Sequence, residues 1–449
     1  MRRYCQINRI LKGNFTAMKR NNVLVDLFTL LLYISIFLIG SESLNSQLFS
    51  LLSAASAFMI AVISLIKNNG VVHTGLTTKY FLWIFCFMLF CYCSAIWAIE
   101  PDLALTKGNS IAKNGLCIML LYMYYGELNN IKHLLKVVMY GGYSVVLLTV
   151  LFFGMNSLTD ILAASVRLNS SFLNQNMLGM LAAFTIIINL YFVLYYHEEK
   201  KAMLFGVASL IVLAAAGSRK SIIELFMGVI LLCITKNYSE KKSVSSLFKV
   251  LIVVTLACFA GYFVIQLPMF SFINMRFENL IHQLTGSGYA DYSVRTRASL
   301  NELGMKLFSE NPILGIGMDC SRIPAKNLTG RDYYLHNNFI ELLADGGVIG
   351  FILFYSIYAL LFYRMIKLKK YRDAEYDISL ILMLIHVVLG YAYVSYYNRE
   401  TYFYLLIYFM ETEILKRKNL QNDNEYQVRN GSDNYEYKTL HRVHKKSLY

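Results

Sequence analysis

The sequence carries little charge. Only 16% of its 449 residues are Asp, Glu, Lys or Arg, whereas an ordinary soluble domain is about 25% charged. Hydrophobic residues make up 57% of the chain, which is enough for about twelve membrane spans of roughly 20 residues each. This composition excludes a soluble enzyme, a disordered chain and a disulfide-rich secreted domain. It also disfavours an outer-membrane barrel, whose strands show only alternating hydrophobicity.

Long apolar runs recur along the chain and predict an all-α polytopic membrane protein with about 12 transmembrane helices. The runs lie at 23–40, 48–66, 80–98, 111–126, 134–154, 175–196, 202–216, 219–235, 248–267, 339–363, 378–396 and 400–415. The first run follows a basic leader that has no evident small-residue cleavage site, which indicates a retained signal anchor.

The distribution of Lys and Arg predicts the orientation of these spans. With the N-terminus inside, 29 of the 42 Lys and Arg residues fall in cytoplasmic segments and 13 in external ones. Cytoplasmic loops of membrane proteins carry such an excess, so both termini are expected in the cytoplasm. The net charge of +14 then needs no nucleic acid to explain it.

The same orientation divides the chain into five segments. They are a cytoplasmic basic leader at 1–22, spans one to nine at 23–267, a long external loop with amphipathic helices at 268–338, spans ten to twelve at 339–416, and a disordered cytoplasmic tail at 417–449. An external loop of this length is well beyond an ordinary connection, which favours a functional role for it.

The sequence also lacks the usual signatures of nucleotide and metal chemistry. It has no Walker A loop, HExxH, GxSxG or Cys/His zinc spacing, and no external Asp-x-Asp pair. The external acidic residues Asp102, Asp291, Asp319 and Asp332 are isolated in the sequence. We therefore predict neither a metal nor a cofactor. An external enzyme must use a donor that is already activated, such as a lipid pyrophosphate.

The segment LHNNFIELLADGGVIG at 335–350 enters the tenth span from outside. Asn337 and Asn338 are good N-cap residues. His336 would then lie at a helix N-terminus, where the helix dipole favours anions and disfavours imidazolium. A neutral imidazole in that place suits a base next to a phosphate. The same pattern also fits a capped, glycine-packed span with an incidental histidine.

The polar residues inside this segment have an ambiguous placement. At 100° per residue, a continuous helix puts His336, Leu343, Gly347 and Gly350 on one stripe. Glu341 and Asp345 then fall on the opposite face. The sequence Asp-Gly-Gly at 345–347 could break the helix, so the role of both carboxylates stays open.

Three further segments place cations on the expected external side. Gly217-Ser218-Arg219-Lys220-Ser221 forms a tight turn, in which Arg219 suits phosphate binding and Lys220 could support it. Arg167 precedes the amides Asn174 and Asn176, which could bind sugar hydroxyls or simply cap a helix. Arg295 and Arg297 precede the glycine-rich segment 311–317 in the long loop. Interfacial or solvated arginines are the plain alternative for each segment.

These four segments together resemble motifs of the O-antigen ligase and polysaccharide polymerase family. HNNFIELLADGGVIGFILF is similar to its His-Asn…Glu-x-Gly-x-x-Gly stretch, and RTRASLNELGMKLFSENPILGIG to the stretch before it. GSRKS and RLNSSFLNQNMLG resemble its Gly-Ser-Arg turn and its Arg…Asn-Gln-Asn segment. The resemblance covers about 160–360, with Asp345 where the family usually has Glu.

The resemblance implies a metal-independent, inverting glycosyltransferase of the C type, located in the bacterial plasma (inner) membrane. His336 would be the general base, and Arg219, Arg167 and Arg297 would bind the pyrophosphate of an undecaprenyl-pyrophosphate-linked oligosaccharide. Supporting residues would be Lys220, Asn174, Asn176, Asn337, Glu341 and Asp345.

Three functions are compatible with these residues. The leading hypothesis is a polymerase of a bacterial surface polysaccharide, which extends an acceptor glycan and works beside a flippase and a chain-length regulator. A ligase that moves finished glycan to a lipid or wall acceptor would use the same residues. A lipid-linked oligosaccharide flippase is less favoured, because it should show two similar halves and more charges inside its spans.

Overall fold

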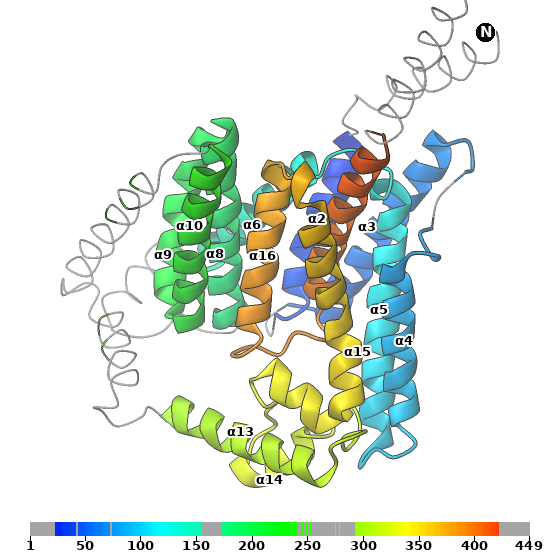
Figure 1. The fold of residues 1–449 in the computed structure, drawn as a ribbon. Helices are drawn as coiled ribbons and strands as arrows, with labels where there is room; N and C mark the ends of the chain where they lie inside the picture. The colour runs from blue at the N-terminus through cyan, green and yellow to red at the C-terminus, as the bar shows by residue number, and fades with distance from the viewer. Residues whose placement is uncertain are drawn as a thin grey trace, which may run out of the picture.

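A computed structural model of the chain describes residues 23–41, 44–71, 74–153, 173–240 and 292–421, together with a few isolated positions between 245 and 278. Every regular element among these residues is a helix (Figure 1). The principal helices are α2 (Val23–Leu38), α3 (Ser46–Lys67), α4 (Lys79–Ser94), α5 (Pro101–Tyr125), α6 (Lys132–Phe153), α8 (Gln175–Tyr191), α9 (Met203–Ala216), α10 (Arg219–Ser239), α13 (Tyr292–Glu310), α14 (Arg322–Thr329), α15 (Asn338–Leu368) and α16 (Ala374–Leu389), followed by a helix at 399–421.

Five of the described helices are long and apolar enough to cross a membrane. They are Ser46–Lys67, Lys132–Phe152, Gln175–Tyr196, Arg219–Ser239 and Asn338–Tyr371. The all-helical membrane fold is therefore confirmed for the described residues, whereas the number of twelve spans stays a prediction. The ninth predicted run, 248–267, lies almost entirely outside the described residues.

The helix α5 extends further than its apolar run indicated. It begins at Pro101, ten residues before the predicted run at 111–126, so the helix also includes the polar segment 101–110. Pro101 occupies the first turn, where the missing N–H of proline costs no hydrogen bond. Lys107, in this additional length, lies 3.3 Å from Asp319, which precedes α14.

The helix at 399–421 runs through the interior of the bundle, with its apolar residues enclosed by protein. Tyr402 to Leu406 are almost fully buried. The hydroxyl groups of Tyr33 and Tyr404 lie 2.6 Å apart, and the Tyr80 hydroxyl donates to the backbone oxygen of Tyr402 at 2.6 Å. Buried tyrosines need such partners, so this central helix fixes the positions of its neighbours.

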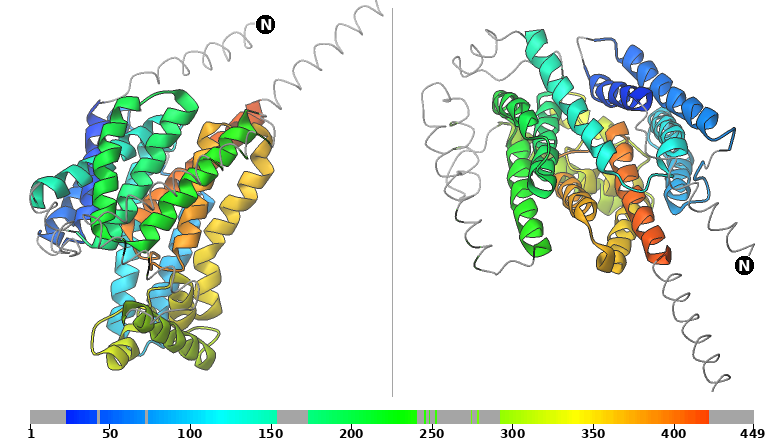
Figure 2. Two further views of the ribbon diagram at one scale, coloured as in Figure 1. Left: turned by 90° about the vertical axis from the view of Figure 1, so that its left-hand side faces the viewer. Right: turned by 90° about the horizontal axis from the view of Figure 1, so that it is seen from above.

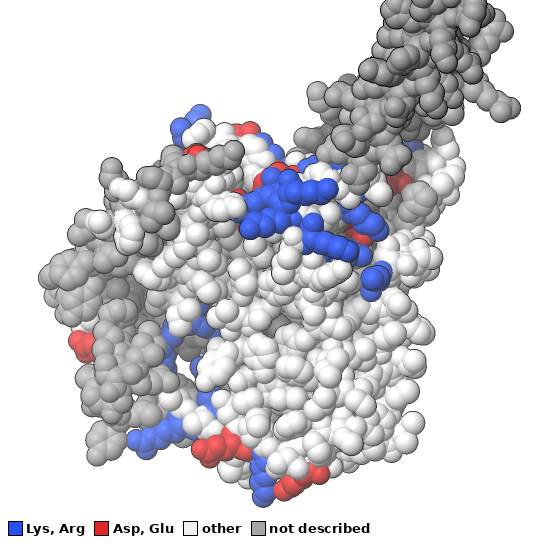
Figure 3. All heavy atoms as spheres, viewed as in Figure 1, with Lys and Arg blue, Asp and Glu red and all other residues white. Residues whose placement is uncertain are grey.

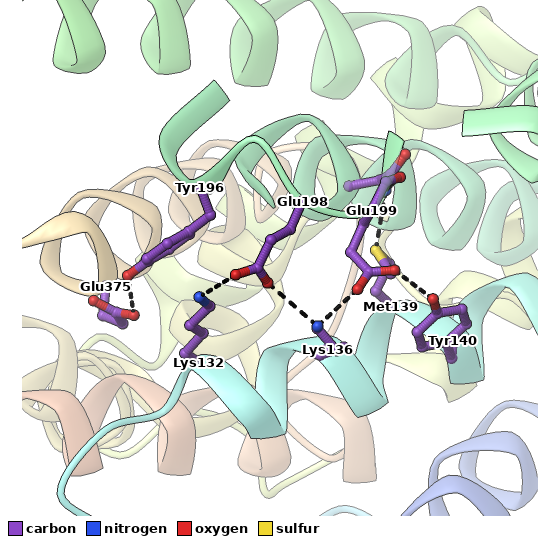
Figure 4. Close-up of polar contacts among 9 residues, drawn as sticks. Lys132, Lys136, Met139, Tyr140, Tyr196, Glu198, Glu199 and Glu375 are labelled. Atoms are coloured by element: carbon purple, nitrogen blue, oxygen red, sulfur yellow. Dashed lines mark hydrogen bonds and ion pairs between the residues drawn. The ribbon is translucent and has the colours of Figure 1, made fainter. Parts of the chain in front are cut away.

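One end of the bundle, which we call the basic end, collects charged side chains. Lys132 and Lys136 of α6 form ion pairs with Glu198 and Glu199, at 2.7 to 3.3 Å (Figure 4). At this end of the bundle Figure 3 shows a large blue area, with some red within it, above a largely uncharged band. Exposed lysines lie in the last turn of α15, directly after it and near the end of the helix at 399–421. They include Lys367, Lys369, Lys370 and Lys416. The described chain also begins and ends here (Figures 1 and 2).

The opposite end, which we call the layer end, is covered by α13, α14 and their loops (Figure 1). This layer packs on the connection between α4 and α5. The backbone N–H of Ile99 donates to the oxygen of Ile316 at 3.1 Å, and the N–H of Met318 donates to the Ser94 hydroxyl at 3.2 Å. The α4–α5 hairpin thus supports the segment that leads into α15.

Candidate functional site

The glycine-rich segment 311–317 crosses a break in α15. Gly347 has φ of 61° and ψ of −164°, a conformation that glycine alone adopts readily. Backbone hydrogen bonds of 2.9 to 3.2 Å span the break and join Ile316 to Ala344, Gly317 to Asp345, Val348 to Pro312 and Ile349 to Ile313. The loop therefore satisfies backbone groups that the broken helix leaves unpaired.

His336 lies in the turn that leads into α15, in a left-handed conformation with φ of 60°. The helix itself begins at Asn338, and the Asn337 side chain caps it by accepting two N–H groups of the first turn at 3.0 and 3.3 Å. From within the helix, Glu341 Oε2 accepts the N–H of Leu335 at 2.8 Å. Buried side chains therefore hold the turn on both sides of the imidazole.

This geometry corrects the stripe expected for a continuous helix. His336 precedes the helix, so it shares no helical face with Leu343, Gly347 or Gly350. The helix is broken at Gly347, as the Asp-Gly-Gly sequence allowed. Glu341 and Asp345 lie one turn apart and are both completely buried.

Two cations from other elements act on the imidazole. Burial, the charge of Arg297 and the charge of Lys220 together lower the pKa of His336 to about 3. Arg297 lies on α13 and Lys220 on the first turn of α10, so segments distant in the sequence converge here. His336 is consequently neutral across the physiological pH range and is able to accept a proton.

Two tyrosines that the sequence interpretation did not single out flank His336. The ring centroids of Tyr333 and Tyr334 lie 5.8 and 4.1 Å from that of the imidazole. Their only signal in the sequence was their position directly before the Leu-His-Asn-Asn segment. They contribute to the burial that keeps the imidazole neutral.

The loop 390–398 links the His336 turn to α10. The Asn338 side-chain oxygen accepts the N–H groups of Ser395 and Tyr396 at 2.9 and 3.1 Å. The Lys220 ammonium donates to the backbone oxygen of Ala392 at 3.1 Å, and it lies 4.7 Å from the centroid of the Tyr393 ring. One loop therefore positions both Lys220 and the start of α15.

A buried ionic cluster joins the layer to α5 and α15. The Lys107 ammonium lies 3.3 Å from Asp319 Oδ2, and Arg322 Nε donates to Asp319 Oδ1 at 2.8 Å. Asp345 Oδ1 accepts the backbone N–H of Ser321 at 2.8 Å. Asp319 is isolated in the sequence, because its partner Lys107 lies more than two hundred residues earlier. Buried charges of this kind are tolerated only when they are paired.

The motif that contains Asn174 and Asn176 packs against the GSRKS turn. Asn174 caps α8 by accepting the N–H of Asn176 at 3.0 Å. A Cβ atom at Gly179 would approach the Ser221 hydroxyl to 2.6 Å, so the two helix starts are in close contact. Arg219, the first residue of α10, is partly buried there. Arg167 lies outside the described residues.

The four motifs therefore meet at the layer end, apart from the Arg167 position. A neutral imidazole lies beside Arg297 and Lys220, with Arg219 next to Lys220 in the chain. Such an arrangement suits removal of a proton from a hydroxyl group close to a bound anion. In the described part of the chain, no three His, Cys, Asp or Glu side chains are grouped to hold a metal ion.

The comparisons with known proteins give one family match. Residues 204–355 match the family model described as O-antigen ligase. The matched range contains the GSRKS turn, α13, the loop 311–317 and the His336 segment. A comparison with curated proteins finds no match.

Proposed function

Residues 204–355 match the O-antigen ligase family model, and from this match we propose that the chain is a polymerase of a bacterial surface polysaccharide. The donor is a glycan linked to undecaprenyl pyrophosphate, and the acceptor is a sugar hydroxyl on the external face of the plasma membrane. The reaction needs no metal, because protein cations neutralise the leaving group.

One observation carries the proposal. His336 is partly exposed and uncharged, and it lies within electrostatic reach of Arg297 and Lys220. A base that must take a proton from a hydroxyl has to be unprotonated, and a pyrophosphate leaving group needs positive charge. The same site supplies both requirements.

The reaction proceeds in one displacement. The His336 imidazole accepts the proton of the acceptor hydroxyl as its oxygen attacks the anomeric carbon. The bond between that carbon and the pyrophosphate oxygen breaks, and undecaprenyl pyrophosphate leaves with the electron pair. Arg219 and Arg297 bind this leaving group, with Arg167 assigned the same role from its motif. A single displacement inverts the configuration at the anomeric carbon.

The supporting residues have structural roles in this proposal. Asn337 and Glu341 hold the turn that carries His336, while Asp345 holds the segment that leads into α14. Asn174 caps α8 beside the GSRKS turn, with Asn176 in the first turn of that helix. Each side chain thus fixes a backbone segment close to the reacting groups.

A ligase would use the same groups with a different acceptor, so product analysis separates the two functions. Purified protein is incubated with lipid-linked repeat units, and the products are separated on a gel. A polymerase gives a ladder of lengths, whereas a ligase gives product only when a lipid or wall acceptor is added. A flippase gives no new glycosidic bond.

The role of His336 is tested with His336→Asn, because asparagine tolerates the left-handed backbone of this turn. We expect kcat to fall by about 10² to 10⁴, the usual contribution of a general base. His197→Asn is the matched control, since His197 has φ of 56° and lies at the basic end. A His336→Asn variant with unchanged kcat would refute the proposed base.

A further inference from the structure

An exposed apolar surface lies at the layer end, beside α4 and α15. The turn after α4 exposes Ile96 and Ile99, and the glycine-rich loop exposes Ile313 and Leu314. In the part of the chain that the structure describes, Ile96 is 86% exposed and Ile313 is 66% exposed. Neighbouring aliphatic side chains that stay this exposed mark a contact surface for a membrane or for another protein. We call these four residues and Trp97 the apolar shoulder.

Hydrogen bonds hold the two segments of the apolar shoulder together. The Trp97 indole N–H donates to the backbone oxygen of Leu314 at 3.2 Å, and the N–H of Ile99 donates to the oxygen of Ile316 at 3.1 Å. The centroid of the partly exposed Trp97 ring lies 6.1 Å from that of Phe90 on α4. Because the indole N–H is already paired within the protein, the ring can face lipid without losing a hydrogen bond.

The apolar shoulder continues an apolar stripe on each neighbouring helix. On α15, the N–H of Ile349 donates to the oxygen of Ile313 at 3.2 Å, and Ile352, about one turn later, is 60% exposed. Both isoleucines belong to the candidate membrane span Asn338–Tyr371. On α4, exposed apolar side chains recur at helical spacing toward Ile96. They are Leu82, Phe85, Leu89 and Cys93. In Figure 3 the surface on this side is largely uncharged from the blue area down to the layer end.

The beginning of α5, on the same hairpin, has a mostly polar surface. Its exposed side chains include Asp102, Thr106 and Asn109. The Tyr92 hydroxyl of α4 donates to Asn109 Oδ1 at 2.8 Å at the exposed contact between the two helices. The α4–α5 hairpin is therefore apolar along α4 and polar at the start of α5. Elements that lie at a membrane surface typically divide their side chains in this way.

We propose that the apolar shoulder contacts the lipid leaflet at the layer end, so that the tip of the α4–α5 hairpin and the loop 311–317 lie at the membrane–water boundary. Two observations favour lipid over a protein partner. The shoulder is continuous with stripes that face acyl chains along α4 and α15, and it contains a tryptophan, which is enriched at membrane–water interfaces. Exposed Glu100 and Asn311 follow and precede its two segments and set its polar limit.

Lipid contact at the apolar shoulder would fix the level of the loop 311–317 relative to the membrane. This loop crosses the break at Gly347 through backbone hydrogen bonds, and α15 begins nine residues before the break. The contact would therefore hold the beginning of α15 at the level of the lipid headgroups. For the proposed reaction, that is where the pyrophosphate of a lipid-linked donor lies, but the contact itself does not depend on that reaction.

The two tryptophans of the chain allow a direct test, because only Trp97 belongs to the apolar shoulder. Trp83 is buried, and its indole N–H donates to the oxygen of Leu353 at 2.8 Å. Trp83→Phe is reconstituted into phosphatidylcholine vesicles with or without bromine atoms on the acyl chains close to the headgroup. We expect a large loss of Trp97 emission in the brominated vesicles, because quenching by bromine requires close approach of the lipid. The matched control Trp97→Phe, which keeps only buried Trp83, should lose far less.

A spin label gives a second measurement, which decides should Trp83→Phe fail to fold. The label is attached to Ile96→Cys in a Cys93→Ser background, since Cys93 is exposed. Its collisions with oxygen, which concentrates in lipid, are compared with those of a water-soluble nickel chelate. We expect the Ile96→Cys label to collide more with oxygen. The matched control is Asn109→Cys on the polar start of α5, whose label should collide more with the chelate. Cys93→Ser alone supplies the background signal.

Two outcomes would overturn the proposal. Unquenched Trp97 emission, or an Ile96→Cys label that collides mainly with the chelate, would show that lipid does not cover the apolar shoulder. Quenching that disappears as the protein-to-lipid ratio rises would assign the shoulder to a second copy of this chain. None of these measurements involves glycan transfer, so lipid contact is accepted or rejected independently of the proposed function.

Discussion

At the scale of single residues, the main result is the neutral state of His336. The sequence predicted a neutral imidazole from the dipole of a helix N-terminus. In the structure the largest cause is burial, followed by the charges of Arg297 and Lys220. The prediction of neutrality therefore agrees with the structure, but for a cause that depends on residues far away in the chain.

The first prediction concerns pH. Positive neighbours disfavour the imidazolium, so Arg297→Gln should raise the pKa of His336 above the value of about 3 in the wild type. As the pH is lowered from 7 toward 3, the fall in kcat/KM should begin at a higher pH in the variant than in wild type, because a larger fraction of the imidazole is protonated at each pH. Measured pH profiles of kcat/KM check this. The control is Arg295→Gln, because Arg295 is an exposed position on the same helix. Coincident pH profiles for Arg297→Gln and wild type would contradict the prediction.

At the scale of elements, two sequence motifs prove to be one structural unit. The segment 311–317 and the Asp-Gly-Gly of α15 were interpreted separately. A Cβ atom at Gly315 would lie 2.4 Å from the backbone of Asp345, and one at Gly347 would lie 2.3 Å from the oxygen of Ile313. These glycines allow two backbones to meet, which a sequence pattern alone does not reveal.

The second prediction belongs to this unit. Gly347→Ala should lower the unfolding temperature of the purified protein and reduce turnover, because the loop 311–317 can no longer dock. Gly330→Ala is the matched control, since Gly330 also has a positive φ, of 72°, but no atom lies within 4 Å of its Cβ position. That control should cost only about 1 kcal/mol of backbone strain. If the unfolding temperature and the turnover fell equally in both variants, docking of the loop 311–317 at the helix break would be unimportant.

At the scale of the whole molecule, the charged residues mark the two ends of the bundle. The described chain begins and ends at the basic end, and α15 begins at the layer end (Figure 1). His336 lies two residues before the start of α15. The inside bias of Lys and Arg predicts that the basic end faces the cytoplasm. A reaction at the layer end would then occur on the external side of the membrane.

The third prediction tests this orientation with cysteines at exposed positions. In spheroplasts, a membrane-impermeant maleimide should label Glu310→Cys in α13, at the layer end. It should label Lys370→Cys, at the basic end, only after the membrane is permeabilised. Exposed Cys93 is replaced by Ser in both variants to remove a competing thiol. The reverse labelling pattern would overturn both the topology and the external site.

The sequence by itself determined the helical membrane class and predicted the residues of the candidate site. Two local properties carry this information, namely long apolar runs and an uneven distribution of Lys and Arg. Both can be recognised without any tertiary contact. The motifs around His336, Arg297 and Lys220 could be found for the same reason. The helix break at Gly347 was foreseen as an option from its two glycines.

Only the tertiary structure decided how these residues act together. The pairing of Lys107 with Asp319 and the hydrogen bond from Lys220 to Ala392 join segments that are far apart in the chain. The shift in the pKa of His336 likewise needs charges on α10 and α13. Electrostatic effects and burial depend on distance in space, which the order of residues does not specify. Composition therefore identifies a hydrophobic chain with few charges, and folding determines which of those charges surround the proposed base.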